Sequence, residues 1–101
     1  MNKAQQRKAT PIDRGFNRYF PDAIRAVAQL SLIANDQHHP GSPLHWDRNK
    51  STDEADALMR HLLDAGDNWD ALDDDGVYHV VKVAWRGMAM AQKILEKQHD
   101  K

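Results

Sequence analysis

Three histidines and a tryptophan occur together in the polar segment HHPGSPLHWD, which lies between two stretches with helical periodicity. Histidine titrates near neutral pH and binds metal ions, and tryptophan offers a flat surface on which a nucleobase can stack. The functional hypothesis is therefore a substrate-binding loop; the alternative is that the tryptophan fills a gap between helices while its neighbours face water. The candidate substrate-binding residues here are His38, His45, Trp46 and Arg48.

A second polar group recurs at helical spacing in the C-terminal third of the chain. At 100° per residue, Asp75, His79, Lys82 and Arg86 fall within roughly 60° of one another. In one interpretation Asp75 orients His79 or shares a metal with it, and the two cations receive phosphate oxygens. The alternative is a solvated helix face with ion pairs between successive turns, and the spacing alone favours it.

The segment between these two groups carries two polar strips. Asp53, Asp56 and Arg60 lie opposite the apolar face of a predicted helix, where ordinary solvated residues lie. In an oligomer that side could border a cleft, and the two aspartates could then bind magnesium. Glu54 and His61 share another strip, which flanks the core. A histidine at such a boundary is more often a packed residue than a ligand, and Glu54 keeps both interpretations open.

Three helices are expected to position these side chains. The first begins near Pro21, carries apolar residues at helical spacing, and ends near Gln37 ahead of a Pro-Gly pair. A capping box, Ser51–Glu54, opens the second, whose buried side would be Ala55, Leu58 and Leu62. The third is predicted from about Asp74 to Glu96, and its broad apolar face consists of Val77, Val80, Val81, Ala84, Met88, Ala91 and Leu95.

The sequence therefore predicts an all-α fold, a small bundle of three main helices. A helix with so broad an apolar face needs a partner, so we expect a homo-oligomer. We expect a mobile basic arm over residues 1–18, one all-α nucleotide-binding domain over 19–97 and a polar tail over 98–101.

Composition limits the classes of function. The chain has 101 residues, enough for one domain, and its 14 basic and 15 acidic residues give a formal net charge of −1. This balance argues against duplex nucleic acid as a partner. No apolar run approaches the roughly 18 residues of a membrane span, and no signal peptide is recognisable, so we expect a cytoplasmic protein.

Several motifs of common enzymes are missing. The chain has no cysteine, which excludes thiolate chemistry. It also has no glycine-rich phosphate loop, no HExxH, no EF-hand and no nucleophile motif. Any catalysis must therefore be metal-assisted or of the acid–base type.

Five short motifs in order make the chain similar to a known family. They are Phe20-Pro-Asp-Ala-Ile, Asn35-Asp-Gln-His-His-Pro-Gly, Leu44-His-Trp, Arg60-His-Leu-Leu and Asp74-Asp-Gly-Val-Tyr-His. Together they resemble phage proteins of the dATP/dGTP diphosphohydrolase type, over roughly Tyr19 to Leu95. The motif positions carried over to this chain are His38, His45, Trp46, Arg60, His61, Gly76 and His79.

The resemblance implies a small all-α phage protein that acts on purine deoxynucleoside triphosphates. Similar all-α pyrophosphohydrolases use a divalent metal, Mg²⁺ or Mn²⁺, and water to release pyrophosphate and leave the monophosphate. The chain departs from the pattern in two places. The paired-glutamate motif is only approximated by Asp53-Glu54-Ala-Asp56. Lys82 stands where relatives often carry a second histidine, which would weaken a second metal position and add a phosphate contact.

We therefore expect metal-dependent hydrolysis of dATP or dGTP in the host cytoplasm of a phage. Two alternatives stay open: a non-catalytic module that sequesters a nucleotide or cyclic nucleotide signal, and a structural or regulatory helical protein. The predicted catalytic residues are Glu54, His61 and His79. The predicted metal ligands are Asp53, Asp56 and Asp75. The predicted substrate-binding residues are His38, His45, Trp46, Arg48, Arg60, Lys82 and Arg86.

Overall fold

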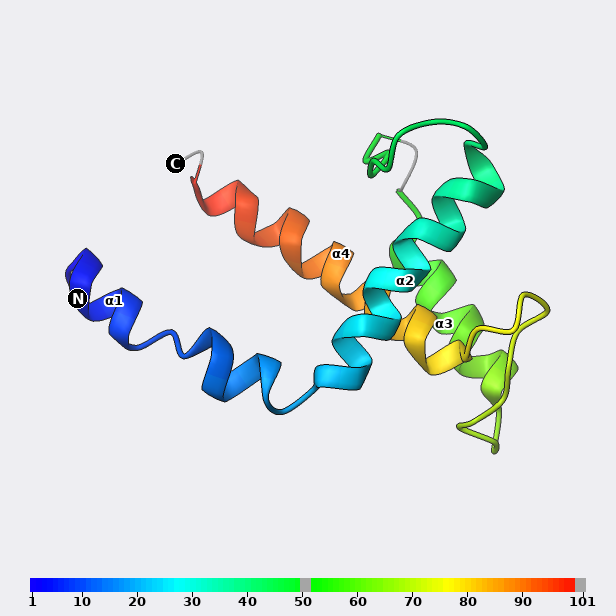
Figure 1. Ribbon diagram of the computed structural model, residues 1–101, viewed down its shortest axis with the longest axis horizontal. Coiled ribbons are helices and arrows are strands. Elements are labelled where there is room, and N and C mark those ends of the chain that lie inside the picture. The colour runs from blue at the N-terminus through cyan, green and yellow to red at the C-terminus, as the bar shows by residue number, and fades with distance from the viewer. Residues whose placement is uncertain (50–51, 100–101) are drawn as a thin grey trace.

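In residues 1–49 and 52–99, which the computed structural model describes, the chain forms five helical segments (Figure 1). These are α1 (Lys3–Lys8), a short π-helix η1 (Asp13–Asn17), α2 (Pro21–His38), α3 (Glu54–Ala65) and α4 (His79–His99). The described residues contain no β-strand, only an isolated antiparallel bridge between Leu72 and Tyr78. The prediction of an all-α fold with three main helices is confirmed. None of the helices in the described residues is long and apolar enough to cross a membrane.

Helix α2 begins and ends where the sequence predicts. Pro21 occupies its first turn, where the missing N–H costs nothing, and Asp22 lies at the positive end of the helix dipole. The helix ends at His38, immediately ahead of the Pro-Gly turn. Leu30 and Asn35 are its buried residues. A hydrogen bond of 2.8 Å from Trp85 Nε1 to Ser31 Oγ connects α2 with α4.

The predicted core side of helix α3 is correct only in part. Leu58 and Leu62 are half-buried, but Ala55 is exposed. The most buried residues of the helix are Glu54, Ala57 and Ala65. The N-cap is Asp53, which makes no side-chain capping hydrogen bond, and the Ser51 of the predicted capping box lies outside the described residues.

Helix α4 begins at His79, five residues later than predicted, because the preceding segment is a turn. The backbone N–H of Asp73 donates to the carbonyl of Val77 at 2.8 Å, and Gly76 has a φ of +79°. A positive φ of this kind favours glycine. Asp75 therefore precedes the helix. At its other end α4 continues to His99, past the predicted end at Glu96.

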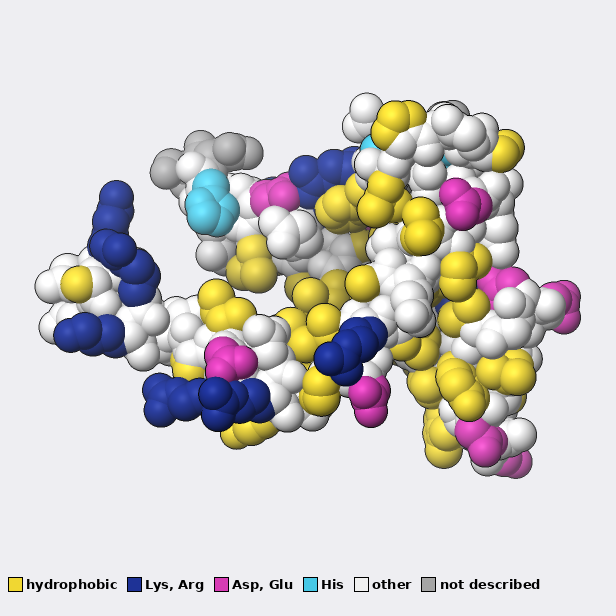
Figure 2. Space-filling model, viewed as in Figure 1, with side chains coloured by type: hydrophobic (Ala, Val, Ile, Leu, Met, Phe, Trp, Pro, Cys, Tyr) yellow, Lys and Arg dark blue, Asp and Glu magenta, His cyan; other side chains and the backbone are white. Residues whose placement is uncertain are grey.

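Most of the apolar face predicted for α4 points away from the bundle, although Val77 and Val81 are half-buried. Met88 and Leu95 are 56% and 53% exposed, and Ala84 and Ala91 are exposed as well. The polar strip faces inward instead, and His79 is buried. The inward strip can be polar because its charged side chains find partners on neighbouring segments, as described below. Figure 2 shows hydrophobic side chains spread over the visible surface.

The interior of the bundle is small. The buried hydrophobic residues are Leu30, Ala57, Ala65 and Ala89, and no large side chain among the described residues is fully buried. Helices α3 and α4 form the most extensive contact, α2 packs on α4, and η1 touches α2. Helix α1 has no buried residue, and with η1 it forms an arm that leads away from α2 (Figure 1). The predicted mobility of this arm stays a prediction.

Ala57 tests the α3–α4 contact because its side chain is completely buried. We expect Ala57→Leu to lower the unfolding free energy by about 1–3 kcal/mol, since the added methylenes must force the helices apart. The control is Ala28→Leu on exposed α2 surface. Thermal denaturation followed by circular dichroism, at equal protein concentration, measures both. Equal melting temperatures for the two variants would contradict this packing.

Candidate functional site

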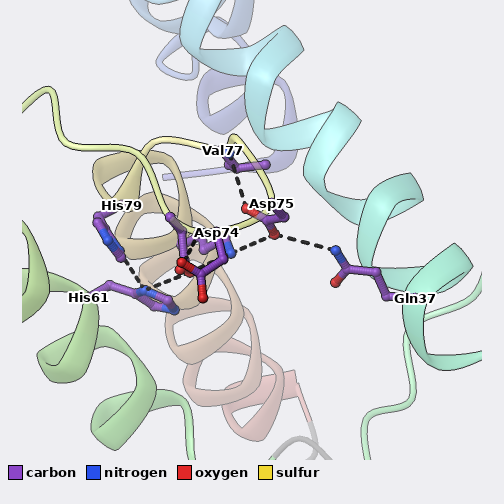
Figure 3. A network of polar contacts seen from close by, with 8 residues as sticks. Gln37, His61, Asp74, Asp75, Val77 and His79 are labelled. Atoms are coloured by element: carbon purple, nitrogen blue, oxygen red, sulfur yellow. Dashed lines mark hydrogen bonds and ion pairs between the residues drawn. The ribbon is translucent and has the colours of Figure 1, made fainter.

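Two imidazole rings meet between α3 and α4. His61 Nδ1 lies 3.0 Å from His79 Nδ1, and the ring centroids are 5.3 Å apart (Figure 3). His79 is buried and His61 is half-buried. At 3.0 Å one ring donates an N–H and the other accepts it, which requires at least one of them to be neutral at that atom. The sequence places the strip of Glu54 and His61 at the edge of the core, whereas in the structure this strip lies in the contact between α3 and α4.

An ammonium group between two carboxylates adjoins the imidazole pair. Lys82 Nζ lies 2.8 Å from Asp73 Oδ2 and 2.7 Å from Asp75 Oδ2. Asp75 also accepts hydrogen bonds from the Val77 backbone N–H at 3.1 Å and from Gln37 Nε2 at 3.4 Å (Figure 3). Asp73 Oδ2 lies 3.9 Å from His61 Nδ1. The turn before α4 therefore supplies both carboxylates, and α2, α3 and α4 each contribute a side chain.

These contacts change the pKa values of the cluster. Burial and the positive charge of Lys82 lower the pKa of His61, although Asp73 opposes them in part. Hydrogen bonds from Lys82 and from the Asp74 backbone lower the pKa of Asp73. Burial by itself lowers the pKa of Lys82, but the hydrogen bonds to the two carboxylates outweigh it and raise that pKa. The cluster thus combines a neutral imidazole, a permanent cation and two ionised carboxylates.

A second ionic group lies two helical turns away along α3, about 10 Å. The Glu54 carboxylate is buried, with Lys93 Nζ at 3.2 Å and Arg86 Nη1 at 3.9 Å. Burying a carboxylate requires such partners, since an unpaired charge in the interior is strongly destabilising. Glu54 therefore holds Arg86 and Lys93 of α4 against the N-terminus of α3.

A pocket of about 770 Å³ lies beside both ionic groups. Its walls come from α2, the loop after it, the start of α3 and the inner face of α4. Among its lining residues, Asn35 Oδ1 and Trp46 Nε1 are buried without a hydrogen-bond partner among the described residues. Asn35 Nδ2 donates to the Ser42 carbonyl at 3.0 Å, which fixes Oδ1 as the free acceptor. One buried acceptor and one buried donor thus adjoin the pocket, and such atoms call for a ligand or water.

The structure places Trp46 against α4 and at the pocket wall, and its predicted stacking on a nucleobase stays a prediction. Its ring meets Trp85 edge to face, with centroids 5.9 Å apart, so it fills a gap against α4. It also lines the pocket. The Arg48 guanidinium lies 4.4 Å from the Trp46 ring centroid and makes two 2.6 Å hydrogen bonds to the Glu96 carboxylate. Arg48 therefore pairs with α4 and does not line the pocket.

The predicted site residues divide into two sets. The first set lines the pocket or contacts a residue that does; it consists of His38, His45, Trp46, Asp53, Glu54, His61, Asp75, His79, Lys82 and Arg86. Arg48 also contacts a lining residue, since its guanidinium lies over the Trp46 ring. The second set consists of Asp56 and Arg60, which do not line the pocket. Both Asp56 and Arg60 are exposed on α3. Of the predicted histidines, His38 and His61 line the pocket, and His79 lies against His61.

Several residues of the site were missed by reasoning from the sequence. They are Asn35, Gln37, Asp64, Asp73, Trp85 and Lys93. Asp73 lies just before the predicted start of the last helix at about Asp74, so the helical spacing that groups Asp75 with His79 does not include it. Asn35 stands in a motif quoted for the family resemblance, but nothing in the spacing indicates that its amide is buried.

Two groups of donor atoms among the described residues could hold a metal ion. In the first, one ligand atom each of His61, Asp64 and His79 lie within 4.8 Å of one another; the second, in the loop after α2, consists of His39, His45 and Asp47. Two nitrogen ligands at about 2.0–2.1 Å from one ion lie roughly 3 Å apart when they are adjacent, which fits the 3.0 Å between His61 and His79. Asp53, Asp56 and Asp75 do not form such a group together.

Comparisons with known proteins give one match. Residues 2–101 match the family described as dATP/dGTP diphosphohydrolase, N-terminal. No curated protein matches the chain, and no solved structure does.

The influence of Lys82 on His61 can be measured directly. In the metal-free protein we expect the His61 imidazole to titrate with a midpoint below pH 6.5. In Lys82→Gln the midpoint should be higher, because a neighbouring positive charge is removed. Proton NMR titration gives both midpoints. The control is Arg25→Gln, which removes an exposed cation on α2 and should leave the midpoint unchanged. A midpoint that stays the same in Lys82→Gln would contradict the described contact.

Proposed function

The chain belongs to the dATP/dGTP diphosphohydrolase N-terminal family, and we propose that it hydrolyses dATP and dGTP to the monophosphate and pyrophosphate with a divalent metal ion. One observation carries this proposal: the facing Nδ1 atoms of His61 and His79, 3.0 Å apart, adjoin a pocket that Lys82 and Arg86 line. Imidazole nitrogens can bind a metal ion, and basic side chains at the pocket wall can bind phosphate oxygens, so the arrangement suits a metal–phosphate substrate.

The donor chemistry fits a metal ion held by His61, His79 and Asp64. Two imidazoles and one carboxylate suit a transition-metal ion such as Mn²⁺ better than Mg²⁺, which prefers oxygen ligands. When bound, the ion would polarise phosphate oxygens and lower the pKa of a bound water. The lowered pKa of His61 favours the neutral imidazole that metal binding requires.

The pocket walls supply the groups that a purine deoxynucleotide needs. Its volume of about 770 Å³ lies within the range of small-molecule sites. Arg86, which Glu54 holds in place, would bind phosphate oxygens. At the other wall, the free acceptor of Asn35 and the free donor of Trp46 match the hydrogen-bonding edge of a purine. In this proposal Glu54 is a positioning residue, since its carboxylate is engaged by two cations.

A non-catalytic nucleotide-binding protein is the second candidate, and the position of Lys82 favours it. Its ammonium group already binds both carboxylates of the turn before α4, which are the oxygen donors that a further metal ion would use. Such a protein would sequester a nucleotide without cleaving it. A phage origin, a cytoplasmic location and assembly into a homo-oligomer belong to the same proposal.

Product analysis distinguishes the two candidates. We expect purified protein with Mn²⁺ to convert dATP and dGTP to monophosphate and pyrophosphate, and to be inactive with EDTA. His61→Ala and His79→Ala should each lower the rate at least about 100-fold, since loss of supporting groups at a metal site already costs 10–100-fold. His99→Ala, at the exposed end of α4, is the control. Chromatography of the nucleotides measures the outcome.

The same experiment shows which outcomes would contradict each candidate function. Intact nucleotide recovered from denatured protein, together with a raised melting temperature but no product, would favour the sequestering protein. If neither product nor ligand-dependent stabilisation is found with any deoxynucleotide, both candidates are wrong. Full activity of both histidine variants would remove the imidazole pair from the mechanism.

Asn35 tests the proposed purine edge. Asn35→Leu removes the free acceptor at similar volume, so we expect the affinity for dATP and dGTP to fall about tenfold. The affinity for inorganic pyrophosphate, which has no base, should stay the same. Asn17→Leu, on the exposed arm, is the matched control, and isothermal titration calorimetry measures all three ligands. Equal losses for pyrophosphate and purine nucleotide would show a general disturbance of the pocket.

A further inference from the structure

The outer side of α4 is an uncharged apolar surface. We call it the α4 face; it consists of Val80, Ala84, Met88, Ala91, Ile94 and Leu95. Val80, Met88, Ile94 and Leu95 are between 39% and 56% exposed. On a helix of 3.6 residues per turn, the charged residues of α4 lie on the other half of the cylinder; these are Lys82, Arg86, Lys93, Glu96 and Lys97. A continuous apolar strip of this kind marks an interaction surface.

A single chain has a much larger accessible surface area than a compact protein of the same mass. A compact protein of 11.5 kDa has about 5,800 Å² of accessible surface, whereas this one has 8020 Å². The radius of gyration is 15.8 Å, compared with about 13 Å for a compact chain of this length. A standard interface buries about 800 Å² per partner. Part of this excess belongs to the arm of α1 and η1 (Figure 1), and part to the exposed apolar side chains of α4.

We infer that the α4 face binds the α4 face of a second copy, with the two helices antiparallel. Ala84, Met88, Ala91 and Leu95 follow one another at intervals of four, three and four residues, which is the spacing of a helix–helix seam. Antiparallel pairing about a two-fold axis places Met88 opposite the partner's Ala91 and Leu95 opposite the partner's Ala84. Each large side chain then meets a small one, and the reciprocal pair repeats the contact.

The charge distribution supports a second copy as the occupant. The α4 face has no formal charge, so an acidic or basic partner would lose solvation without gaining an ion pair. The matching surface must be apolar and helical, and the α4 face of another copy meets both conditions.

Gly87 provides an independent indication. It lies inside α4 with nothing within 4 Å of the position that a Cβ would take, so packing within one chain does not require glycine. A glycine inside a helix costs about 1 kcal/mol relative to alanine. It borders the α4 face, where a missing side chain allows a crossing helix to approach closely.

Light scattering coupled to size exclusion tests the assembly. We expect the wild type to be a dimer at micromolar concentration and Met88→Lys to be a monomer with similar helical circular dichroism, because a lysine at the centre of the seam would be buried without a partner. Ala28→Lys, on exposed α2 surface, is the control and should remain a dimer. A monomeric wild type, or a Met88→Lys protein that remains a dimer, would overturn the proposal.

Cross-linking tests the register and does not depend on whether Met88→Lys folds. The chain has no cysteine, so Ala84→Cys and Leu95→Cys each introduce a unique thiol. After the two variants are unfolded together, refolded and oxidised, the antiparallel register predicts a disulfide-linked dimer in the mixture and little in either variant alone. Parallel packing predicts the reverse. Reversed yields, or no cross-link in the mixture, would overturn the register.

These outcomes are separate from those of the proposed function. Oligomeric state and cross-linking are measured without nucleotide, and none of the substituted residues lines the pocket. A monomer that hydrolyses dATP would overturn the interface and the expected homo-oligomer but not the hydrolysis, and an inactive dimer would overturn only the enzyme.

Discussion

The contact between α3 and α4 at small side chains is the constraint on which the rest of the structure depends. Ala57, Ala65 and Ala89 are among the most buried residues of the protein. Because alanine side chains are short, the helices approach closely there, and longer polar side chains reach across the seam on either side. The inner surface of α4 therefore carries histidine, lysine and arginine, each paired with a group on α3 or on the preceding turn.

A polar seam of this kind is tolerated only when its groups are satisfied. Burying an unpaired charge would destabilise a small protein by several kcal/mol, so each cation must lie beside a carboxylate. Lys82 takes two partners from the aspartate-rich turn, and Glu54 receives two cations from α4. The imidazole pair adjoins the Lys82 group, where burial and the nearby cation lower the His61 pKa. The same contacts that stabilise the helix pair place Lys82 and Arg86 at the wall of the pocket proposed for the nucleotide.

The orientation of α4 links this site to the proposed interface. One helix cannot direct the same strip both inward and outward, so turning its polar residues to the pocket leaves the apolar ones outside. Because the apolar residues of α4 lie outside, large buried side chains are scarce in the described bundle. A second copy that covers the α4 face would supply the apolar burial that one chain lacks.

The sequence by itself determined the elements: helical periodicity and the Pro-Gly turn set the bounds of α2, and the five short motifs identified the family. The segment around Asp75 was assigned to a helix because its spacing fits one, but a glycine with positive φ and a pair of backbone contacts make it a turn. Only the tertiary structure decided which face of each helix lies inside. Periodicity identifies an apolar stripe but assumes that it is the buried one. That assumption fails where alanines form the helix contact and paired charges make a polar interior stable. The contacts of Asp73 and Asn35 likewise became visible only in the folded chain.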